Sequence, residues 1–209
     1  MKIAVVCANG KAGNLITKEA LAHSLDVTAV VRGENRSGAA QAIIKDLFDL
    51  TAADLEPFDV VVDAAGGWKS DTVGVIPKAV RHLCGLLKGT VKRLLVVGGA
   101  GSLFVNKEHT LTVADGEDFP ESFKPLAQAH QEALTFLRGQ RDVAWTYISP
   151  AADFRSGGER TGQYTLAGEE LALNARGEST ISYADYAIAV VDEIVAAKHV
   201  GQRISVVSK

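Results

Sequence analysis

The sequence predicts an α/β fold in which a doubly wound parallel sheet is covered by helices on both faces. Short runs rich in valine, isoleucine and leucine alternate with helical patterns along most of the 209 residues. These runs are apolar almost without interruption, which is typical of strands buried on both faces of a parallel sheet. Hydrophobic residues make up 47% of the chain and charged residues 22%, a balance that suits one globular domain.

Strands are expected at residues 2–6, 26–32, 43–48, 59–65, 93–99, 143–149 and 203–208. Apolar spacing predicts helices between them, at residues 13–23, 74–88, 125–139 and 183–197. The last helix has a start signal, because Ser182 can cap its first free amides while Asp185 reaches back in a capping box. No repeat, low-complexity tract or linker divides the chain, so residues 1–209 are expected to form a single domain.

One segment, residues 151–181, departs from this alternation. It carries five glycines and little helical periodicity. An irregular excursion near the C-terminal ends of parallel strands often builds a substrate pocket, which is the role expected here. A surface subdomain without catalytic consequence is the alternative.

Charge and cysteine content exclude several classes of partner. The formal net charge is -3 and the pI is near 6.0, so the chain lacks the basic footprint of a nucleic-acid-binding protein. Cys7 and Cys84 lie in apolar segments without metal-ligand spacing, which predicts a reduced, cytoplasmic protein with no metal site. No apolar run approaches the length of a membrane span. The expected partner is a small molecule, and a homodimer is left open.

The stretch from Lys2 to Ile16, KIAVVCANGKAGNLI, has the order of a dinucleotide-binding turn. Gly10 lets the backbone turn, Gly13 lets the following helix pack close to the sheet, and the helix N-terminus offers unpaired N–H groups to a pyrophosphate. The pattern is G-x-x-G-x-x-G with Cys7 in the first place, which the turn tolerates if Cys7 keeps a negative φ. A tight turn without a ligand is the alternative.

The end of the second strand indicates which dinucleotide is bound. An acidic residue usually stands there in NAD-binding folds, whereas this chain has Arg32, 22 residues after Gly10. A guanidinium suits the 2′-phosphate of NADP, and Lys11 and Arg36 are plausible neighbours. Glu34 could instead contact a ribose. NADP(H) is therefore the predicted cofactor, with NAD as the alternative.

Taken together, these motifs resemble those of the atypical short-chain dehydrogenase/reductase-like proteins provisionally labelled NADH-flavin reductases. That group is related to biliverdin reductase B and, more distantly, to the NmrA-like regulators. The resemblance spans nearly the whole chain and implies a Rossmann-like NAD(P)-binding fold. Besides the glycine loop and Arg32, it rests on KDLFDL (45–50), DVVVDAAGGW (59–68), LLVVGGAGSL (94–103), WTYISPAADF (145–154) and ISYADYAIAVVDEI (181–194).

The resemblance implies cofactor contacts at matching positions, although Cys7 and Asn9 stand where many relatives carry glycine and threonine. The implied pyrophosphate cradle is Asn9, Gly10, Lys11, Ala12, Gly13 and Asn14. The implied adenosine contacts are Arg32 at the 2′-phosphate and Asp46 and Leu47 at the adenine. The implied contacts towards the nicotinamide are Ala65, Gly66 and Gly67 at the ribose and Ser149 and Pro150 at the carboxamide.

The catalytic tyrosine–lysine pair of typical short-chain dehydrogenases is missing. No tyrosine of this chain is followed four residues later by a lysine, which disfavours ordinary alcohol or ketone chemistry. Reduction of a flavin, quinone or tetrapyrrole demands less, because the extended acceptor holds charge and collects its proton from solvent. The sequence therefore favours an NAD(P)H-dependent oxidoreductase with a flat conjugated acceptor such as a flavin or quinone. A non-catalytic NADP-binding sensor of the NmrA-like type is the alternative.

Individual side chains of the active site are weaker predictions. Ser102 could orient the acceptor or cofactor, or be a turn residue. His130 could donate a proton near pH 7, or be an ordinary helix residue. Phe154 could stack on a flat acceptor and Arg155 could hold its phosphate or carboxylate, or both could serve packing and the surface.

Overall fold

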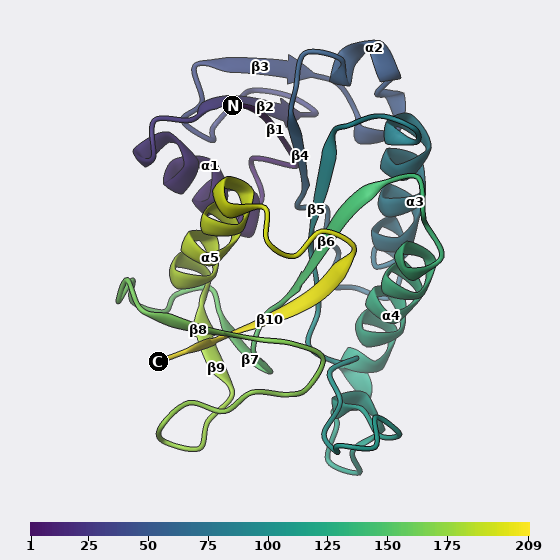
Figure 1. Ribbon diagram of the computed structural model, residues 1–209, viewed down its shortest axis with the longest axis vertical. Helices are drawn as coiled ribbons and strands as arrows, with labels where there is room; N and C mark the ends of the chain where they lie inside the picture. The colour runs from purple at the N-terminus through teal and green to yellow at the C-terminus, as the bar shows by residue number, and fades with distance from the viewer.

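The computed structural model describes residues 1–209 and contains an eight-stranded sheet between two layers of helices (Figure 1). Neighbouring strands are parallel except for the edge strand β8, which is antiparallel to β10. The order across the sheet is β3 (Gln41–Ile44), β2 (Asp26–Val31), β1 (Lys2–Val6), β4 (Val60–Asp63), β5 (Arg93–Val97), β6 (Ala144–Ser149), β10 (Gln202–Ser208) and β8 (Tyr164–Ala167). The predicted doubly wound fold is confirmed.

Helices cover both faces of this sheet. In Figure 1, α1 (Lys11–Ala22) and α5 (Tyr183–Ala196) lie on one face, and α3 (Val75–Leu87) and α4 (Lys124–Arg138) lie on the other. Alternate strand residues point to opposite faces: Val6 packs in the core beneath α3 and α4, whereas Val5 packs beneath α1 and α5. This two-sided burial explains why the strands are apolar without interruption. No helix is both long enough and apolar enough to span a membrane.

The structure corrects the expected strand at residues 43–48. Strand β3 ends at Ile44, and Leu47–Asp49 form a 3₁₀ turn, η1. The carboxylate of Asp46 ends the extended segment because it accepts a hydrogen bond of 2.9 Å from the amide of Phe48. Ala52–Leu55 then form the short helix α2.

The start of α5 differs in part from the expected capping box. The Ser182 hydroxyl accepts a hydrogen bond of 2.9 Å from the Asp185 amide, as predicted. The Asp185 side chain does not reach back. Its carboxylate instead accepts hydrogen bonds from the amides of Thr161 and Gly162, both 2.9 Å, and from the Thr161 hydroxyl, 2.8 Å. Asp185 thus holds the preceding loop against α5.

Two excursions leave the sheet after β5 and β6. Residues 98–123, the β5–α4 excursion, contain the turns η2 (Val113–Asp115) and η3 (Glu121–Phe123). Residues 150–182, the β6–α5 excursion, contain β8 and a two-stranded parallel sheet of β7 (Asp153–Arg155) and β9 (Thr180–Ser182). The excursions meet at Phe104, whose amide donates to the Glu169 carbonyl and whose carbonyl accepts from the Leu171 amide. They form the lower part of Figure 1.

Candidate functional site

Strand order places the expected crevice at the C-terminal ends of β1 and β4. Strand β1 lies between β2 and β4, and the chain changes direction across the sheet at this point. The register aligns the strand ends, because Val6 pairs with Val30 of β2 and with Asp63 of β4, and Asp63 pairs with Val96 of β5. Ligands of doubly wound folds bind beyond the strand ends at such a switch point.

The turn from β1 to α1 presents free backbone donors to this crevice. The Gly10 amide donates to the Cys7 carbonyl at 2.9 Å, and the first helical hydrogen bond runs from the Asn14 amide to the Gly10 carbonyl at 2.8 Å. The amides of Lys11, Ala12 and Gly13 precede that bond and have no helical partner. No side chain caps the helix. The positive end of the helix dipole and its free N–H groups are therefore available to an anion.

Gly13 is required by the close approach of α1 to this turn. A Cβ atom at Gly13 would lie 2.5 Å from the Cys7 carbonyl oxygen and 3.1 Å from the Ala8 Cα. A Cβ at Gly10 would lie 3.1 Å from the same oxygen. Gly13 thus has the packing role that the sequence predicted, whereas Gly10, predicted to let the backbone turn, also approaches the Cys7 carbonyl closely.

Cys7 contradicts the expected backbone conformation. Its φ is 60°, in the left-handed region, whereas a negative φ was expected. Glycine adopts this region without a steric penalty and other residues do so rarely, which accounts for the usual glycine at this position. The half-buried thiol packs against the core beneath α3. Burial, and then the Asp63 carboxylate, raise the pKa of the Cys7 thiol to about 12, so it is uncharged at neutral pH.

Two predicted cradle residues use their side chains to hold the loop after β2. Asn9 donates from Nδ2 to the Glu34 carbonyl and accepts from the Arg36 amide, both at 2.8 Å. Asn14 donates from Nδ2 to the Arg36 carbonyl at 3.0 Å. These amides therefore fix residues 34–36 beside the start of α1. Their backbone contacts with a pyrophosphate remain a prediction.

Residues predicted at the adenosine end follow strands β2 and β3. Arg32 is exposed at the end of β2. After burial and the Asp63 carboxylate, the Arg32 charge lowers the pKa of the Cys7 thiol and the Asp46 charge raises it. Leu47 is buried in the core, where it supports η1. The side chain of Glu34 is exposed as well, so both Arg32 and Glu34 can reach a ligand.

The end of β4 forms the next wall of the crevice. The Asp63 carboxylate accepts a hydrogen bond of 3.0 Å from the Ala65 amide and so shapes the turn that follows. Burial raises the pKa of this carboxyl to about 7. Gly67 packs against the Thr72 carbonyl, 2.5 Å from where its Cβ would be, whereas a Cβ on exposed Gly66 would meet no atom within 4 Å. Trp68 follows with 64% of its surface exposed.

Strand β6 contributes an unpaired buried hydroxyl. Ser149 is fully buried, and its Oγ has no hydrogen-bond partner within the protein. A buried hydroxyl without a partner is costly, so a site of this kind is suited to a polar group brought by a ligand. Ser149 is the last residue of β6, and its contact with the nicotinamide carboxamide remains a prediction.

His130 is held in a hydrogen-bonded group behind the β5 end. Its Nδ1 lies 3.1 Å from the Tyr147 hydroxyl, which also accepts a 3.1 Å hydrogen bond from the Gly99 amide. Burial lowers the pKa of His130 to about 4, so its imidazole is neutral at pH 7. Of the two roles that the sequence left open for His130, this favours an ordinary helix residue over a proton donor near pH 7.

Ser102 lies in the β5–α4 excursion, five residues beyond the end of β5 at Val97. It is buried, and its Oγ accepts a hydrogen bond of 3.1 Å from Nη1 of Arg203 in β10. It also lines a cavity of about 400 Å³ between this excursion and α4. Residues of the glycine loop do not line this cavity. The glycines Gly98 and Gly99 are the first residues past β5.

The two predicted substrate residues have partners within the protein. The Phe154 ring stacks on Tyr183 with ring centres 3.8 Å apart and lies 4.8 Å from the Tyr186 ring. The exposed Arg155 guanidinium pairs with Asp153 at 2.6 Å. The packing role explains both positions, and contact with a substrate remains a prediction.

Asp63, Tyr147 and Arg203 were not identified as functional candidates from the sequence. Each lies in a strand that was read from the sequence as an apolar run, so its polar side chain was not considered separately. A charged residue inside such a run was the available signal, because Asp63 and Arg203 are buried despite their charge. No group of three or more histidine, cysteine, aspartate or glutamate side chains is arranged to hold a metal ion.

Three separated groups of the chain suit a nicotinamide dinucleotide at this edge of the sheet. The free amides of Lys11, Ala12 and Gly13 suit the pyrophosphate, the exposed Arg32 suits the adenosine end, and the unpaired Ser149 hydroxyl suits the opposite end. The dinucleotide would supply hydride chemistry, and the chain would hold and orient it.

Comparison with known proteins agrees with this geometry. The sequence profile of the NAD(P)H-binding family matches residues 7–195. The chain is 44% identical to the uncharacterized protein YwnB of Bacillus subtilis, over 100% of this chain and 99% of that protein. A structure from Streptococcus pneumoniae, provisionally named an NADH-flavin reductase, is 49% identical over 100% of both chains, with a TM-score of 0.98. Another, from Bacteroides thetaiotaomicron and provisionally named an epimerase, is 33% identical over 99% of this chain and 96% of that one, with a TM-score of 0.83. The chain therefore belongs to the NAD(P)H-binding family, among proteins like the atypical short-chain dehydrogenases/reductases.

Proposed function

We propose that this protein is an NADPH-dependent oxidoreductase that passes hydride to a flat conjugated acceptor, with flavins and quinones as the leading classes. The observation that carries the proposal is the convergence of three free α1 amides, the exposed Arg32 and the unpaired Ser149 hydroxyl at one edge of the sheet. The Streptococcus pneumoniae relative, whose name implies flavin reduction, supports the choice of acceptor.

The preference for NADPH rests on Arg32. A guanidinium can bind a 2′-phosphate through two parallel charge-assisted hydrogen bonds. Lys11 stands at the start of α1, and Arg36 is held beside it through its backbone by Asn9 and Asn14. Glu34 is the one acid of this loop that would favour an unphosphorylated ribose instead.

The proposed chemistry needs no tuned acid, and the side chains agree with that. Burial raises the pKa of Tyr147, Tyr183 and Tyr186, which is the opposite of the shift a catalytic tyrosine needs. Tyr164 donates its hydroxyl proton to Asp192 at 2.6 Å, and burial also raises its pKa. The chain would hold the acceptor against the nicotinamide, and the acceptor would take its proton from solvent.

The test is NADPH and NADH oxidation by the purified protein with FMN, a soluble quinone and biliverdin as acceptors. We expect saturable turnover with at least one acceptor. Arg32→Glu should raise the KM for NADPH by about 10- to 100-fold, the range for losing a hydrogen-bonded charge pair, and change the KM for NADH much less. Arg141→Glu, the same substitution at an exposed arginine after α4, is the matched control.

Two results would count against the proposal. Equal losses for NADPH and NADH in Arg32→Glu would refute the 2′-phosphate assignment. Tight NADPH binding without turnover on any acceptor would refute the oxidoreductase and favour a dinucleotide sensor.

A further inference from the structure

The loop after β2 is not held by backbone hydrogen bonds. Residues 33–39 lie outside every helix and strand, and none of their amides or carbonyls pairs with another backbone group. Gly33 and Gly38 are both exposed, and a Cβ at either position would meet no atom within 4 Å. Backbone of this kind loses much conformational freedom when it is ordered. The conformation of the loop therefore depends on side chains.

Two asparagines of the glycine turn make all the hydrogen bonds that join this loop to the rest of the chain. Asn9 bridges two loop residues, because its Nδ2 donates to the Glu34 carbonyl and its Oδ1 accepts from the Arg36 amide, both at 2.8 Å. Asn14 Nδ2 donates to the Arg36 carbonyl at 3.0 Å. The N–H and the C=O of Arg36 are thus both held, one by each asparagine.

The remaining hydrogen bonds of the loop are internal. The Asn35 Oδ1 accepts from the Ser37 amide at 3.0 Å and from the Ser37 hydroxyl at 2.7 Å, and the Asn35 Nδ2 donates to the Ala39 carbonyl at 2.8 Å. Ala39 is buried in the core beneath α1 and α5, which anchors the far end of the loop. None of these bonds reaches the glycine turn. The hydrogen bonds that fix residues 34–36 relative to the turn are therefore those of Asn9 and Asn14.

The same two asparagines flank the amides that suit a pyrophosphate. Asn9 precedes Gly10, the N-cap of α1, and Asn14 follows the free amides of residues 11–13. Residues 9–14 thus offer backbone N–H groups to a phosphate on one side and side-chain amides to the loop on the other.

The charged side chains of the loop remain available to a ligand. Arg32, Glu34 and Arg36 are all exposed. Every hydrogen bond of Arg36 is made by its backbone, so its guanidinium is left free. A guanidinium binds a phosphate strongly when its geometry is correct, and a backbone that is already fixed reduces the cost of ordering it.

We propose that Asn9 and Asn14 are positioning residues that set the preference for NADPH over NADH by fixing the backbone of Arg36. The inference rests on the proposed function, which assigns the 2′-phosphate to this loop. The side chains of both asparagines would act through Arg36 and not by touching the dinucleotide. NADH lacks the 2′-phosphate and would gain little from the arrangement.

The test is the binding of NADPH and NADH to the native protein and to Asn9→Ala and Asn14→Ala, followed by nicotinamide fluorescence without an acceptor. Asn9→Ala loses two hydrogen bonds and should raise the Kd for NADPH by about tenfold. Asn14→Ala loses one and should raise it by about threefold. The Kd for NADH should change by less than about twofold in either variant.

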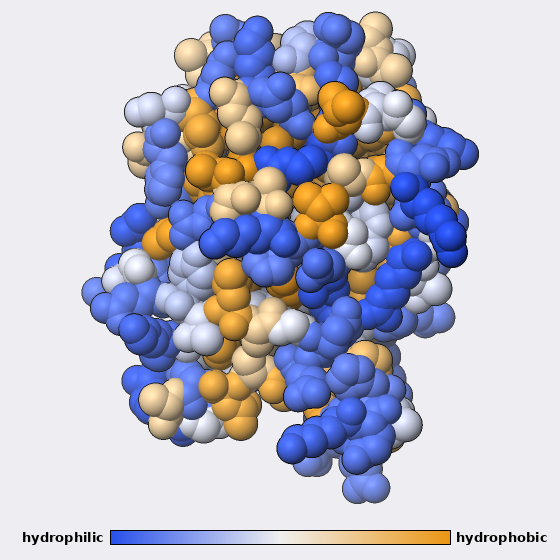
Figure 2. All heavy atoms as spheres, in the orientation of Figure 1, coloured by the Kyte–Doolittle hydropathy of each residue, from blue (hydrophilic) through white to orange (hydrophobic).

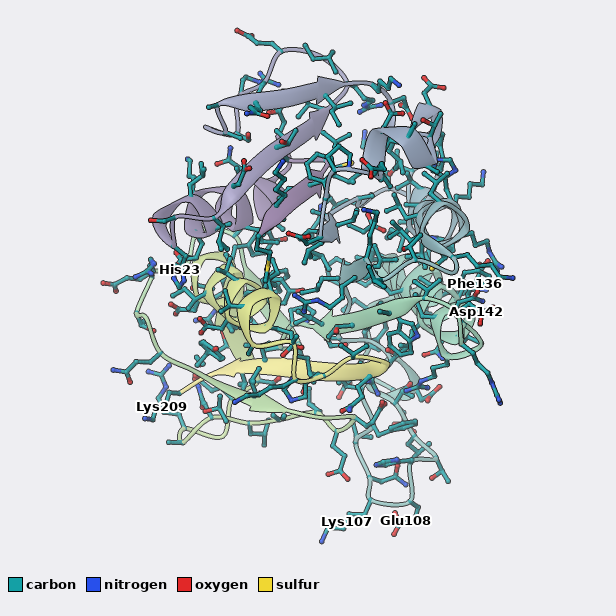
Figure 3. All side chains as sticks on the ribbon, turned by 45° about the horizontal axis from the view of Figure 1, so that its top comes forward. His23, Lys107, Glu108, Phe136, Asp142 and Lys209 are labelled. Atoms are coloured by element: carbon teal, nitrogen blue, oxygen red, sulfur yellow. The ribbon has the colours of Figure 1, made fainter.

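Asn106→Ala is the matched control. The Asn106 side chain also fixes a loop, because its Oδ1 accepts hydrogen bonds from the amides of Thr110 and Leu111 at 3.1 and 3.0 Å. Lys107 and Glu108 mark this loop in Figure 3, at the opposite end of the molecule from β2 and β3. Hydrophilic residues cover the projecting lobe in Figure 2, so the substitution leaves the apolar core in place. The control should bind both dinucleotides like the native protein.

A double-mutant cycle separates positioning from a general loss of structure. Arg36→Gln should itself reduce the preference for NADPH, and adding Asn9→Ala to it should leave the ratio of the two Kd values unchanged. A further tenfold loss of preference in the double variant would overturn the inference, because Asn9 would then act independently of Arg36.

Three other results have distinct meanings. Equal weakening of NADPH and NADH by Asn9→Ala would refute the positioning role. A preference for NADPH that neither asparagine variant alters would refute it too and leave the proposed function intact. The expected shifts in NADPH binding, without reduction of any acceptor, would support the positioning role and refute the proposed oxidoreductase.

Discussion

Replacing Gly13 by alanine tests the dinucleotide turn most directly. The new Cβ would lie 2.5 Å from the Cys7 carbonyl oxygen, and ordinary contacts of this kind begin at 3.4 Å. The start of α1 must therefore retreat by about 0.9 Å, which is 3.4 minus 2.5. Both neighbours are backbone atoms of a turn held by the Gly10–Cys7 hydrogen bond, so no side chain can move aside instead.

The cost of this shift falls on stability and on binding. Forced overpacking typically costs about 1–3 kcal/mol, and the better helix propensity of alanine returns up to about 1 kcal/mol. We expect a net loss of up to about 2 kcal/mol in the free energy of unfolding. A retreat of this size would lengthen hydrogen bonds from the Lys11, Ala12 and Gly13 amides to a phosphate beyond useful range. NADPH affinity should then fall by about tenfold or more.

Urea unfolding and a fluorescence titration with NADPH measure the two effects. Gly85→Ala in α3 is the matched control, because Gly85 is exposed and its Cβ would meet no atom within 4 Å. The free energy of unfolding of the control should rise by about 0.5–1 kcal/mol through helix propensity, and its affinity for NADPH should not change. If Gly13→Ala were as stable as Gly85→Ala and bound NADPH like the native protein, the account of this turn would be refuted.

Two further predictions concern the same edge of the sheet. The free energy of unfolding of Cys7→Val should be about 2 kcal/mol lower than that of Cys7→Gly, because a β-branched residue strongly disfavours a φ of 60°. Equal urea midpoints for the two variants would contradict the left-handed turn. Burial raises the pKa of Asp63 to about 7, so the folded protein keeps a proton that the unfolded chain releases, and this group's contribution to stability falls as pH rises from about 4 to about 7. The stability of Asp63→Asn relative to the native protein should therefore grow over that interval, by at most about 4 kcal/mol, whereas a constant difference would show that Asp63 does not titrate there. The lowered pKa of His130 acts in the opposite direction but is present in both proteins and cancels.

Strand and helix positions were predictable where apolar periodicity decided them. The helix expected at 183–197 is observed at Tyr183–Ala196, and the strand expected at 2–6 is observed as Lys2–Val6. The strand expected at 43–48 failed beyond Ile44 because the Asp46 side chain competes for the backbone amide of Phe48. Local side-chain hydrogen bonds of this kind override an apolar run.

Long-range partners account for the other corrections. The Asp185 carboxylate does not complete the capping box at the start of α5. It accepts hydrogen bonds from Thr161 and Gly162 instead, which lie more than 20 residues earlier in the chain. Burial beside Tyr147 removes the charge of His130, which favours the structural one of its two predicted roles. Neither effect has a local signature, since each depends on which segments fold against one another.

The sequence by itself determined the doubly wound fold, the glycine turn and the place of Arg32, because period, spacing and residue size act locally along the chain. Only the tertiary structure decided the conformation of Cys7, the unpaired Ser149 hydroxyl and the pair of guanidinium groups on Glu169. Burial and the pairing of charges are properties of segments brought together across the fold. Arg203 and Glu169 lie 34 residues apart, and nothing in the sequence between them indicates that they meet.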